Sequence, residues 1–246
     1  MTTTRCRLLL PLAAAAVCVA TAGTAAAQVR ATPEEAVKRA KATFGPPPNC
    51  KQLSEQGQVW IDPAKQLVIC DGYVALRRGA LEMFACTAGT KEHESIVAIF
   101  GRASWIHTGL LAVGAETGQP VSFEPFRPAS GTTIKVYILW YDADGTKHAA
   151  AAQDWIIAAD DKQPMRLDWV FAGSVTVDGP DGEPIYMGDN GDFITVANFP
   201  SATLDLAVRS SAENSSLQFV PRTEAIPPEN TPVRLVLEVS TDPPRQ

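Results

Sequence analysis

From Gln58 onward the sequence consists of short runs of branched and aromatic residues interspersed with Gly, Asp and Pro, and this pattern constrains the fold more than any other feature. Such runs are typical of β-strands joined by turns. The intervening Asp142-Ala143-Asp144-Gly145 predicts a hairpin turn. We expect strands at 66–70, 81–86, 95–100, 133–141, 146–152, 169–177, 192–197, 217–220 and 233–239.

Two internal segments, 104–113 and 154–160, have the spacing of apolar residues that favours short helices. With 46% hydrophobic and 20% charged residues, the chain has enough apolar surface for a buried core, which excludes general disorder. The sequence thus predicts an α+β fold, mainly antiparallel β with a few short helices. We expect one compact domain over 58–240, followed by a C-terminal tail at 241–246.

Residues 28–57 precede this domain and predict a helical arm. Thr32 can cap a helix that Pro33 begins, and Glu35 stands where it completes a capping box. Gly45 and the three prolines that follow it end the helix and form a stiff connector. We interpret this arm as a packing appendage or spacer, with partner binding as the alternative.

The first 27 residues have the three parts of a secretory signal peptide. Arg5 and Arg7 are followed by an apolar run over 8–20 and then by small residues up to Ala27. The run is shorter than the ~20 residues that a transmembrane helix needs, so we expect cleavage and no membrane span in the mature chain. The sequence therefore predicts an exported protein, periplasmic or extracellular.

Charge limits the partners of the mature chain. Removal of the leader takes away two arginines and no acid, which lowers the formal net charge from −6 to about −8. No uninterrupted run of basic residues is longer than the pair Arg77-Arg78. Nucleic acid is therefore not an expected partner, because its binding requires a basic surface. A partner in the cell envelope is consistent with export.

The leader also contains two of the five cysteines, so the mature chain keeps Cys50, Cys70 and Cys86. Three is an odd number for an oxidising compartment. One arrangement is a single disulfide, with Cys50–Cys70 the preferred pair, and one free buried thiol. The other arrangement is three free buried cysteines.

The histidines are the main candidates for chemistry. His93 and Glu94 offer imidazole nitrogen and carboxylate oxygen, which suit a divalent metal such as zinc, and His107, Glu82 or Cys86 could supply a third ligand. The zinc-protease motif is not met, because no second histidine follows four residues after His93. If a strand begins at Glu94, these two neighbours also point to opposite faces. The alternative is that the side chains are hydrogen-bonded or exposed.

A second hypothesis concerns Cys86. Residues 87–92 resemble a hairpin loop between two strands, in which Gly89 supplies the turn. In that antiparallel register His93 faces Cys86. A cysteine beside a histidine can form a thiolate nucleophile or a pair of metal ligands. A shift of one residue removes this contact, and a buried inert thiol is the alternative.

Other catalytic motifs are absent from the sequence. It contains no Gly-x-Ser-x-Gly, phosphate-binding glycine loop, dinucleotide fingerprint or Cys-x-x-Cys. Acidic loops at 142–144, 178–181 and 189–192 contain or border Gly, and turn formation explains them better than calcium binding. Most of the five tryptophans are expected in the core, with a sugar-stacking surface as the alternative.

A group of segments carries a resemblance to a known family. They are Gly79-Ala80-Leu81-Glu82-Met83-Phe84-Ala85-Cys86, Gly89 to Ser95, Ile106-His107 with Leu110 to Ala115, Gln153 to Ile156, Asp168 to Ser174, and Asn198 to Ala202 with Leu204-Asp205. Together they are similar to the YdjY domain, in the exported form of planctomycete-type bacteria, over about residues 58–240. The resemblance implies no established activity and no catalytic residues to carry over, but it directs attention to Lys91–Glu94 and Ile106–His107.

Some relatives of this kind hold a ferredoxin-like cysteine cluster. With three widely spaced cysteines in the mature chain, an iron–sulfur centre is not expected here.

Two functions remain open. The leading hypothesis is a non-catalytic exported domain without a cofactor, a binding or envelope-associated module, because the sequence assembles no acid, base and nucleophile. The alternative is a metal- or thiol-dependent enzyme that uses His93, His107 and Cys86, with Glu82 or Glu94. The two differ in whether those side chains converge in a pocket.

Overall fold

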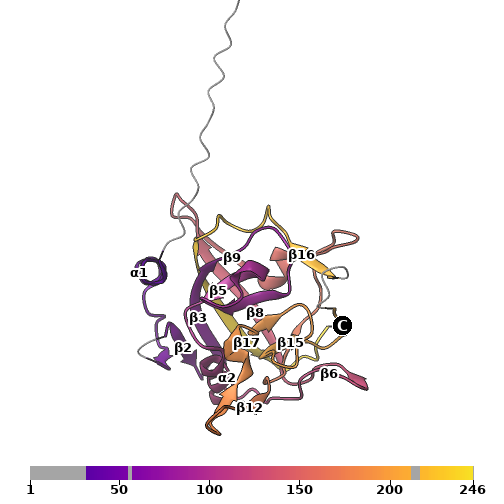
Figure 1. Cartoon of the computed structure of the whole chain (residues 1–246). Coiled ribbons are helices and arrows are strands. Elements are labelled where there is room, and N and C mark those ends of the chain that lie inside the picture. Colours follow the sequence, from indigo (N-terminus) through magenta and orange to yellow (C-terminus); the bar gives the residue numbers. More distant parts are fainter. Residues whose placement is uncertain (1–31, 55–56, 212–216, 246) are drawn as a thin grey trace, which may run out of the picture. The chain divides into compact units, whose positions relative to one another are not determined.

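The computed structural model describes residues 32–54, 57–211 and 217–245. It has two α-helices, α1 (Pro33–Phe44) and α2 (Ala103–Ala112), and three short 3-10 helices, η1 (Glu92–Glu94), η2 (Ala152–Trp155) and η3 (Met187–Asn190). The strands, labelled in Figure 1 where there is room, are β1 (Lys51–Gln52), β2 (Val59–Asp62), β3 (Leu67–Val74), β4 (Met83–Thr87), β5 (Ser95–Ile99), β6 (Ser122–Phe123), β7 (Phe126–Arg127), β8 (Thr133–Tyr141), β9 (Lys147–Ala151), β10 (Ile156–Ala158), β11 (Trp169–Phe171), β12 (Thr176–Asp178), β13 (Pro184–Tyr186), β14 (Ile194–Thr195), β15 (Leu204–Leu206), β16 (Phe219–Pro221) and β17 (Pro232–Ser240).

Within the described residues, eight strands close into a barrel. Their hydrogen-bonded order is β3-β17-β8-β11-β15-β14-β4-β5, and β5 pairs again with β3. β1 and β2 extend the sheet from the first half of β3, and β9 pairs with the second half of β8. Most pairings are antiparallel, while β4–β5 and β14–β15 are parallel. The predicted α+β fold with mainly antiparallel strands is therefore confirmed.

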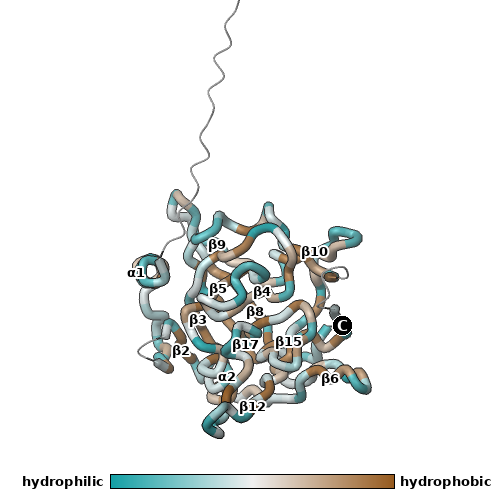
Figure 2. Tube along the Cα trace, viewed as in Figure 1, coloured by the Kyte–Doolittle hydropathy of each residue, from teal (hydrophilic) through white to brown (hydrophobic). Residues whose placement is uncertain are grey.

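Branched side chains that alternate along the two longest strands fill the centre of this sheet. Ile138 on β8 lies opposite Leu235 on β17, and Val136 lies opposite Leu237. All four belong to the main hydrophobic core and are almost completely buried. Burial of one such side chain stabilises the fold by about 1.5–3 kcal/mol. Figure 2 shows hydrophobic residues along the central strands and hydrophilic residues on the outer turns.

The closure of the barrel depends on a glycine. Gly72 on β3 lies opposite Ile99 on β5, and a Cβ atom built on Gly72 would lie 2.2 Å from the carbonyl oxygen of Ala98. Real Cβ atoms do not approach a backbone oxygen this closely. A side chain at this position would therefore push β3 and β5 apart.

The predicted helix at 104–113 is confirmed as α2, and the predicted hairpin turn at 142–145 joins β8 to β9. The helix predicted at 154–160 is wrong. There the chain forms one 3-10 turn, η2, and then β10, in which Ile157 lies opposite Val220 of β16. The two β-branched residues at 156 and 157 favour a strand once β16 offers a partner.

The strand predicted at 169–177 is interrupted. β11 ends at Phe171, and Gly173 and Ser174 both have positive φ, 88° and 62°, so the chain turns before β12. Glycine adopts this conformation without strain, which explains the break. The strand predicted at 192–197 is shortened to β14, where the pairing register with β4 shifts.

The predicted arm helix is confirmed as α1, with the capping box between Thr32 and Glu35 present. Gly45, at φ 60°, ends it. The helix lies against β3 and β17. The preferred Cys50–Cys70 disulfide is not formed, because Cys50, Cys70 and Cys86 are free thiols. The alternative of three free buried cysteines holds for Cys70 and Cys86, whereas Cys50 is only half-buried.

The predicted signal peptide, 1–27, lies outside the described residues. In the part of the chain that the structure describes, no helix combines the length and apolar character that a bilayer span requires.

Candidate functional site

The loop that contains most of the candidate residues does not form the expected hairpin. β4 and β5 are parallel, and Cys86 pairs with Ala98 while Met83 pairs with Ser95. The predicted antiparallel register, in which His93 faces Cys86, is therefore wrong. His93 instead lies in η1, before β5 begins.

Cys86 is fully buried, with 0% of its surface exposed, and packs with Ala75 and Ala98. Burial raises the pKa of its thiol to about 11, although the nearby Ser95 and Thr90 hydroxyl groups act in the opposite direction. A thiol with this pKa is protonated at neutral pH, and only the thiolate is a good nucleophile or metal ligand. The environment of Cys86 therefore matches the alternative interpretation, a buried inert thiol.

His93 lies at the surface, where 75% of its side chain is exposed. Its Nε2 atom is 3.7 Å from Oε2 of Glu94, which is the nearest acidic partner. The imidazole has no enclosing wall, so its position matches an exposed side chain better than a catalytic one.

His107 on α2 is held in an aromatic setting. Its ring meets Phe171 and Tyr186 edge to face, with centroid distances of 4.9 and 5.3 Å. Nδ1 is 3.0 Å from the Tyr186 hydroxyl, which is 3.0 Å from Oγ1 of Thr203. Burial lowers the pKa of His107 and raises that of Tyr186 to about 12, so both groups are neutral near pH 7. The three polar groups satisfy one another and connect α2 to β13.

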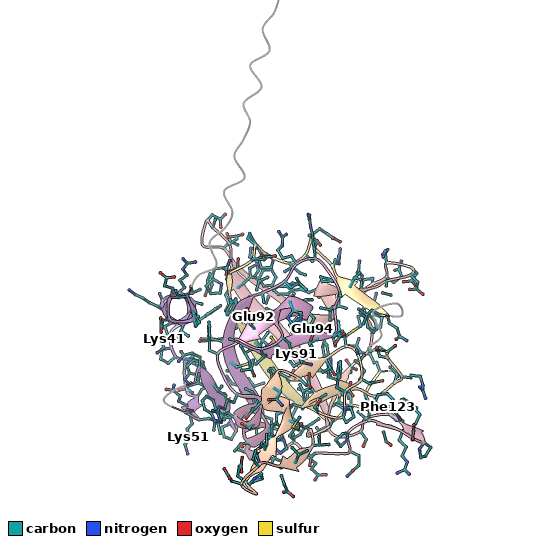
Figure 3. All side chains as sticks on the ribbon, in the orientation of Figure 1. Lys41, Lys51, Lys91, Glu92, Glu94 and Phe123 are labelled. Carbon is teal, nitrogen blue, oxygen red and sulfur yellow. The ribbon has the colours of Figure 1, made fainter. Side chains whose placement is uncertain are left out.

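Glu82 and Glu94 are the predicted residues that the fold brings together. They lie with Lys91, Asp192 and Ser201 in a half-buried group that we call the Lys91 cluster. Lys91 Nζ is 2.7 Å from Asp192 Oδ1 and 3.8 Å from Glu94 Oε1. The Ser201 hydroxyl donates to Asp192 Oδ2 at 2.5 Å. Figure 3 shows Lys91 and Glu94 side by side.

The electrostatics of the Lys91 cluster follow from three carboxylates around one ammonium group. Burial raises the pKa of Glu82, and the neighbouring charge of Glu94 raises it further. For Lys91, burial lowers the pKa, but the hydrogen bond and charge of Asp192 outweigh burial and raise it. Lys91 therefore stays charged and joins the loop before β5 to the loop before β14. The geometry is that of a structural ion-pair network.

No group of three His, Cys, Asp or Glu side chains in residues 32–54, 57–211 and 217–245 has the geometry to hold a metal ion. Glu82, Glu94 and Asp192 carry enough oxygen donors, but Lys91 occupies the space between Asp192 and Glu94. A divalent ion there would have to displace this ammonium group.

A buried carboxylate, Asp205 on β15, lies under the segment Asn198–Ala202. Its Oδ1 accepts hydrogen bonds from the Thr195 hydroxyl at 2.9 Å, the Asn198 amide at 3.1 Å and the backbone of Leu206 at 2.8 Å. Its Oδ2 has no hydrogen-bond partner among the described residues. Burial raises the pKa of Asp205 to about 7. The Ser210 backbone N–H also donates to Asn198 Oδ1. Together these contacts fix the start of the Asn198–Ala202 segment.

A cavity of about 370 Å³ opens between the end of α1 and the β1–β2 pair, and we call it the Trp60 cavity. Gln52 lies opposite Trp60 in the strand register, and Gln58 lies two residues before Trp60 on the same face. Gln58 is only 4% exposed, and it lines the cavity. The lining residues are Lys41, Gly45, Pro46, Gln52, Gln58 and Trp60.

The wall behind Trp60 is rigid. The guanidinium of Arg234 lies over the rings of Phe44 and Trp60, 4.9 and 5.3 Å from their centroids. Arg234 also donates to the carbonyl oxygen of Gly45 at 2.6 Å and to Asp71. These contacts join α1 to the sheet, so both walls of the Trp60 cavity have a fixed separation.

Sequence reasoning missed Asp192 and Ser201 as partners of Lys91, and it missed the Trp60 cavity. A weak signal existed for each. Asp192 lies in an acidic loop whose composition is explained by turn formation. Ser201 lies in one of the segments that carry the family resemblance. Gln58 is a polar residue directly before a strand whose residues are apolar, apart from Asp62.

The comparisons with known proteins give one result. The sequence model of the YdjY domain family matches residues 59–238. No curated protein and no solved structure matches the chain. The matched range includes the eight barrel strands apart from the last two residues of β17, and it includes the Lys91 cluster and Trp60, whereas α1 precedes it. This chain belongs to the YdjY domain family.

Proposed function

We propose that this YdjY domain protein is an exported, non-catalytic binding module that holds a small polar ligand in the Trp60 cavity. The observation that carries the proposal is a largely buried glutamine, Gln58, in the lining of this cavity beside Gln52 and Trp60. Buried polar side chains in proteins have hydrogen-bond partners, and a polar ligand in the cavity supplies them for Gln58.

The positions of the reactive groups support binding over catalysis. Cys86 is buried as a protonated thiol, His107 is neutral between two aromatic rings, and His93 lies in solvent. The alternative, a metal- or thiol-dependent enzyme, requires these side chains to share one pocket. None of the three lines the Trp60 cavity.

Export is the second part of the proposal. It is supported by the composition of residues 1–27 and by the acidic net charge, which does not suit nucleic acid. A protein outside the cytoplasm would meet its ligand in the periplasm, at the envelope or in the medium. Fractionation of the native host and N-terminal sequencing test this part. We expect a mature protein that begins at Gln28, and an uncleaved cytoplasmic chain would contradict it.

The binding part is tested with ¹⁵N-labelled protein and a panel of small molecules that contains neutral sugars, sugar acids, amino acids and dicarboxylates. We expect at least one class to shift the side-chain signals of Gln58 and Trp60, while the spectrum of the added compound stays unchanged over days. Chemical conversion of the compound would contradict a non-catalytic role. A complete lack of shifts at these two residues would contradict the Trp60 cavity as a binding site.

Elemental analysis of the purified protein addresses the metal-dependent alternative. We expect no stoichiometric metal and an unchanged unfolding midpoint in the presence of a chelator. A bound metal at one equivalent, with loss of stability on chelation, would favour the enzyme.

A further inference from the structure

We propose that the Trp60 cavity recognises the carboxylate-bearing ring of an acidic sugar. This inference rests on the proposed binding function and names the class of ligand. It is carried by three features of the lining: the Gln58 and Gln52 carboxamides, the indole of Trp60 and the ammonium group of Lys41.

The two carboxamides determine the polar part of the ligand. A carboxamide offers two N–H donors and one acceptor oxygen in one plane. Gln52 uses one donor for the carbonyl oxygen of Gly57 at 3.0 Å and keeps the other donor and the acceptor oxygen for a ligand. Together they leave donors and acceptors side by side in the same cavity. Neighbouring hydroxyl groups on a sugar ring both donate and accept, and therefore match this lining.

Trp60 provides a flat apolar wall. The whole residue is 4% exposed, and the Arg234 guanidinium lies over the ring at 5.3 Å from its centroid. The ring is therefore fixed before a ligand arrives, which lowers the entropy lost on binding. A flat wall beside two hydrogen-bonding amides suits a molecule with an apolar C–H face and a polar rim, as a sugar ring has.

Lys41 determines the sign of the charge. Of the six described residues that line the Trp60 cavity, it alone has an ionisable side chain. It is exposed in the last turn of α1 and forms no ion pair with another described residue. An ammonium group at the edge of a site favours a carboxylate over a neutral group or a cation. Figure 3 shows Lys41 beside α1, apart from Lys51 on β1.

The size of the cavity limits the ligand to a small unit. A volume of about 370 Å³ lies at the lower end of the range for small-molecule sites. The cavity thus suits one ring with its substituents. That ring can be a free sugar acid or the terminal residue of an acidic glycan, since the recognising groups are the same.

The experiment is a titration of ¹⁵N-labelled protein with glucuronate, glucose, acetate and a trimer of galacturonate. We expect glucuronate to shift the Gln58 and Trp60 side-chain signals and to bind at least tenfold more tightly than glucose or acetate. Tighter binding of the trimer than of the monomer would assign the ligand to a glycan, and equal or weaker binding would assign it to the free acid.

Lys41→Ala and Lys51→Ala form a matched pair. Both residues are exposed, but Lys51 lies opposite Ile61 and Gln52 lies opposite Trp60, so Lys51 is on the other face of the β1–β2 pair. We expect Lys41→Ala to weaken glucuronate about tenfold, to the level of glucose, because a charged hydrogen bond is lost. Lys51→Ala should bind like the unchanged protein.

Gln58→Leu separates binding from folding. Because leucine has a similar size, we expect the variant to stay folded, with a urea midpoint close to that of the unchanged protein, and to lose glucuronate binding at least tenfold. Unchanged binding in a folded Gln58→Leu variant would overturn the assignment.

The two proposals fail differently. If amino acids or dicarboxylates shift Gln58 and Trp60 while glucuronate does not, the acidic-sugar assignment is wrong and a binding cavity remains. Equal affinities for glucose and glucuronate would also overturn it, since Lys41 would then have no role. If no compound shifts either residue, both the ligand class and the binding function are wrong.

Discussion

Arg234 on β17 and Asp71 on β3 form a bidentate ion pair on the sheet face that α1 covers, with Nε 2.6 Å from Oδ1 and a terminal nitrogen 2.9 Å from Oδ2. Both side chains are largely buried. Burial raises the pKa of Asp71, and the hydrogen bonds and charge of Arg234 oppose that change. The same guanidinium stacks on Trp60 and bonds Gly45, so one residue connects the barrel, the arm and the cavity.

Replacement of Arg234 by Met should leave Asp71 buried without a counter-ion. We expect a loss of about 3–5 kcal/mol in the free energy of unfolding, measured in urea, because an unpaired buried charge is costly. Limited proteolysis should then cut near Gly45, since the helix loses its anchor. Arg222→Ala is the control, because its ion pair with Glu224 is exposed, and its unfolding midpoint should not change. Equal stability of the two variants would contradict a structural role for Arg234.

Gly72→Ala tests the closure of the barrel. The new Cβ would lie 2.2 Å from the carbonyl oxygen of Ala98, and backbone cannot move away as a side chain can. We expect a loss of at least about 3 kcal/mol in urea unfolding.

Gly109→Ala on α2 provides the contrast to Gly72→Ala. There the nearest atoms are tips of Leu53, Ile61 and Val68 at 3.0–3.3 Å. Replacement of a helical glycine contributes about 0.5–1 kcal/mol in the favourable direction. We therefore expect a net change below about 1 kcal/mol. A Gly72→Ala variant as stable as Gly109→Ala would show that β3 and β5 are not held together at this position.

Local patterns in the sequence were sufficient to predict α1, α2 and the turn at 142–145. Each depends on residues close in the chain: the Thr32–Glu35 capping box, the apolar spacing along α2, and Asp142 and Asp144, which both accept a hydrogen bond from the Thr146 backbone. Propensity and hydrogen bonding within a few residues decide these elements.

The parallel pairing of β4 and β5 could not be predicted in the same way. Residues 87–92 contain a glycine and match a hairpin loop, but the connection 88–94 runs back along β4 instead. A connection of seven residues can span up to about 23 Å. This is longer than a five-residue strand, which measures about 16 Å. Both connections are therefore sterically feasible. Contacts between residues distant in sequence decide between the two connections. One of these contacts is the pairing of β5 with β3.

The two sites depend on the same kind of distant contact. Lys91 meets Asp192 across 101 residues, and the Trp60 cavity needs Lys41 from α1 beside the β1–β2 pair. No spacing rule joins such residues before the barrel order is known. Alternation along β2 does place Gln58 and Trp60 on one face, so part of the cavity lining was available from the pattern.

Lys91→Ala should make stability depend more steeply on pH. At pH 7 the variant leaves Glu82, Glu94 and Asp192 without the ammonium group, whereas at pH 4 protonation relieves their repulsion. The pKa of Glu82 is raised in the folded protein, so ionisation of Glu82 lowers the free energy of unfolding as pH rises. Lys91 counteracts this effect, and its removal therefore makes the decrease larger. We expect a loss of about 1 kcal/mol at pH 7 and a smaller one at pH 4.

The measurement for Lys91→Ala is urea unfolding at both pH values, in low and high salt. High salt should reduce the difference between the variant and the unchanged protein at pH 7, because it screens like charges. Lys51→Ala should show no such effect. A loss that is the same at both pH values would mean that Lys91 acts by packing on Phe199, whose ring centroid is 5.0 Å from Nζ, and not by charge.

The three thiols should react with iodoacetamide at very different rates. Cys50 is partly exposed, whereas Cys70 and Cys86 are fully buried and burial raises the pKa of each. In native protein at pH 8, mass spectrometry should locate the modification first at Cys50, and at the other two only after addition of urea. Fast labelling of Cys86 in folded protein would reopen the thiol-dependent enzyme.

Asp205→Asn should remove a pH dependence that the native protein has. The pKa of Asp205 is about 7 in the folded state, against an ordinary 3.8, so the folded protein holds a proton that the unfolded chain releases. Native stability should therefore fall as pH rises from about 4 to about 7 and then level off. Asparagine keeps an acceptor for Thr195, Asn198 and Leu206 and carries no charge. By pH 8 the variant should be more stable than the native protein by about 2–4 kcal/mol, with little difference at pH 4. Urea unfolding across pH 4–8 measures this difference.

Asp205→Ala is the control, because alanine has no acceptor for these hydrogen bonds. It should be less stable than Asp205→Asn at every pH. Parallel profiles for the native protein and Asp205→Asn would mean that Asp205 is ionised throughout, and that an additional donor reaches Oδ2.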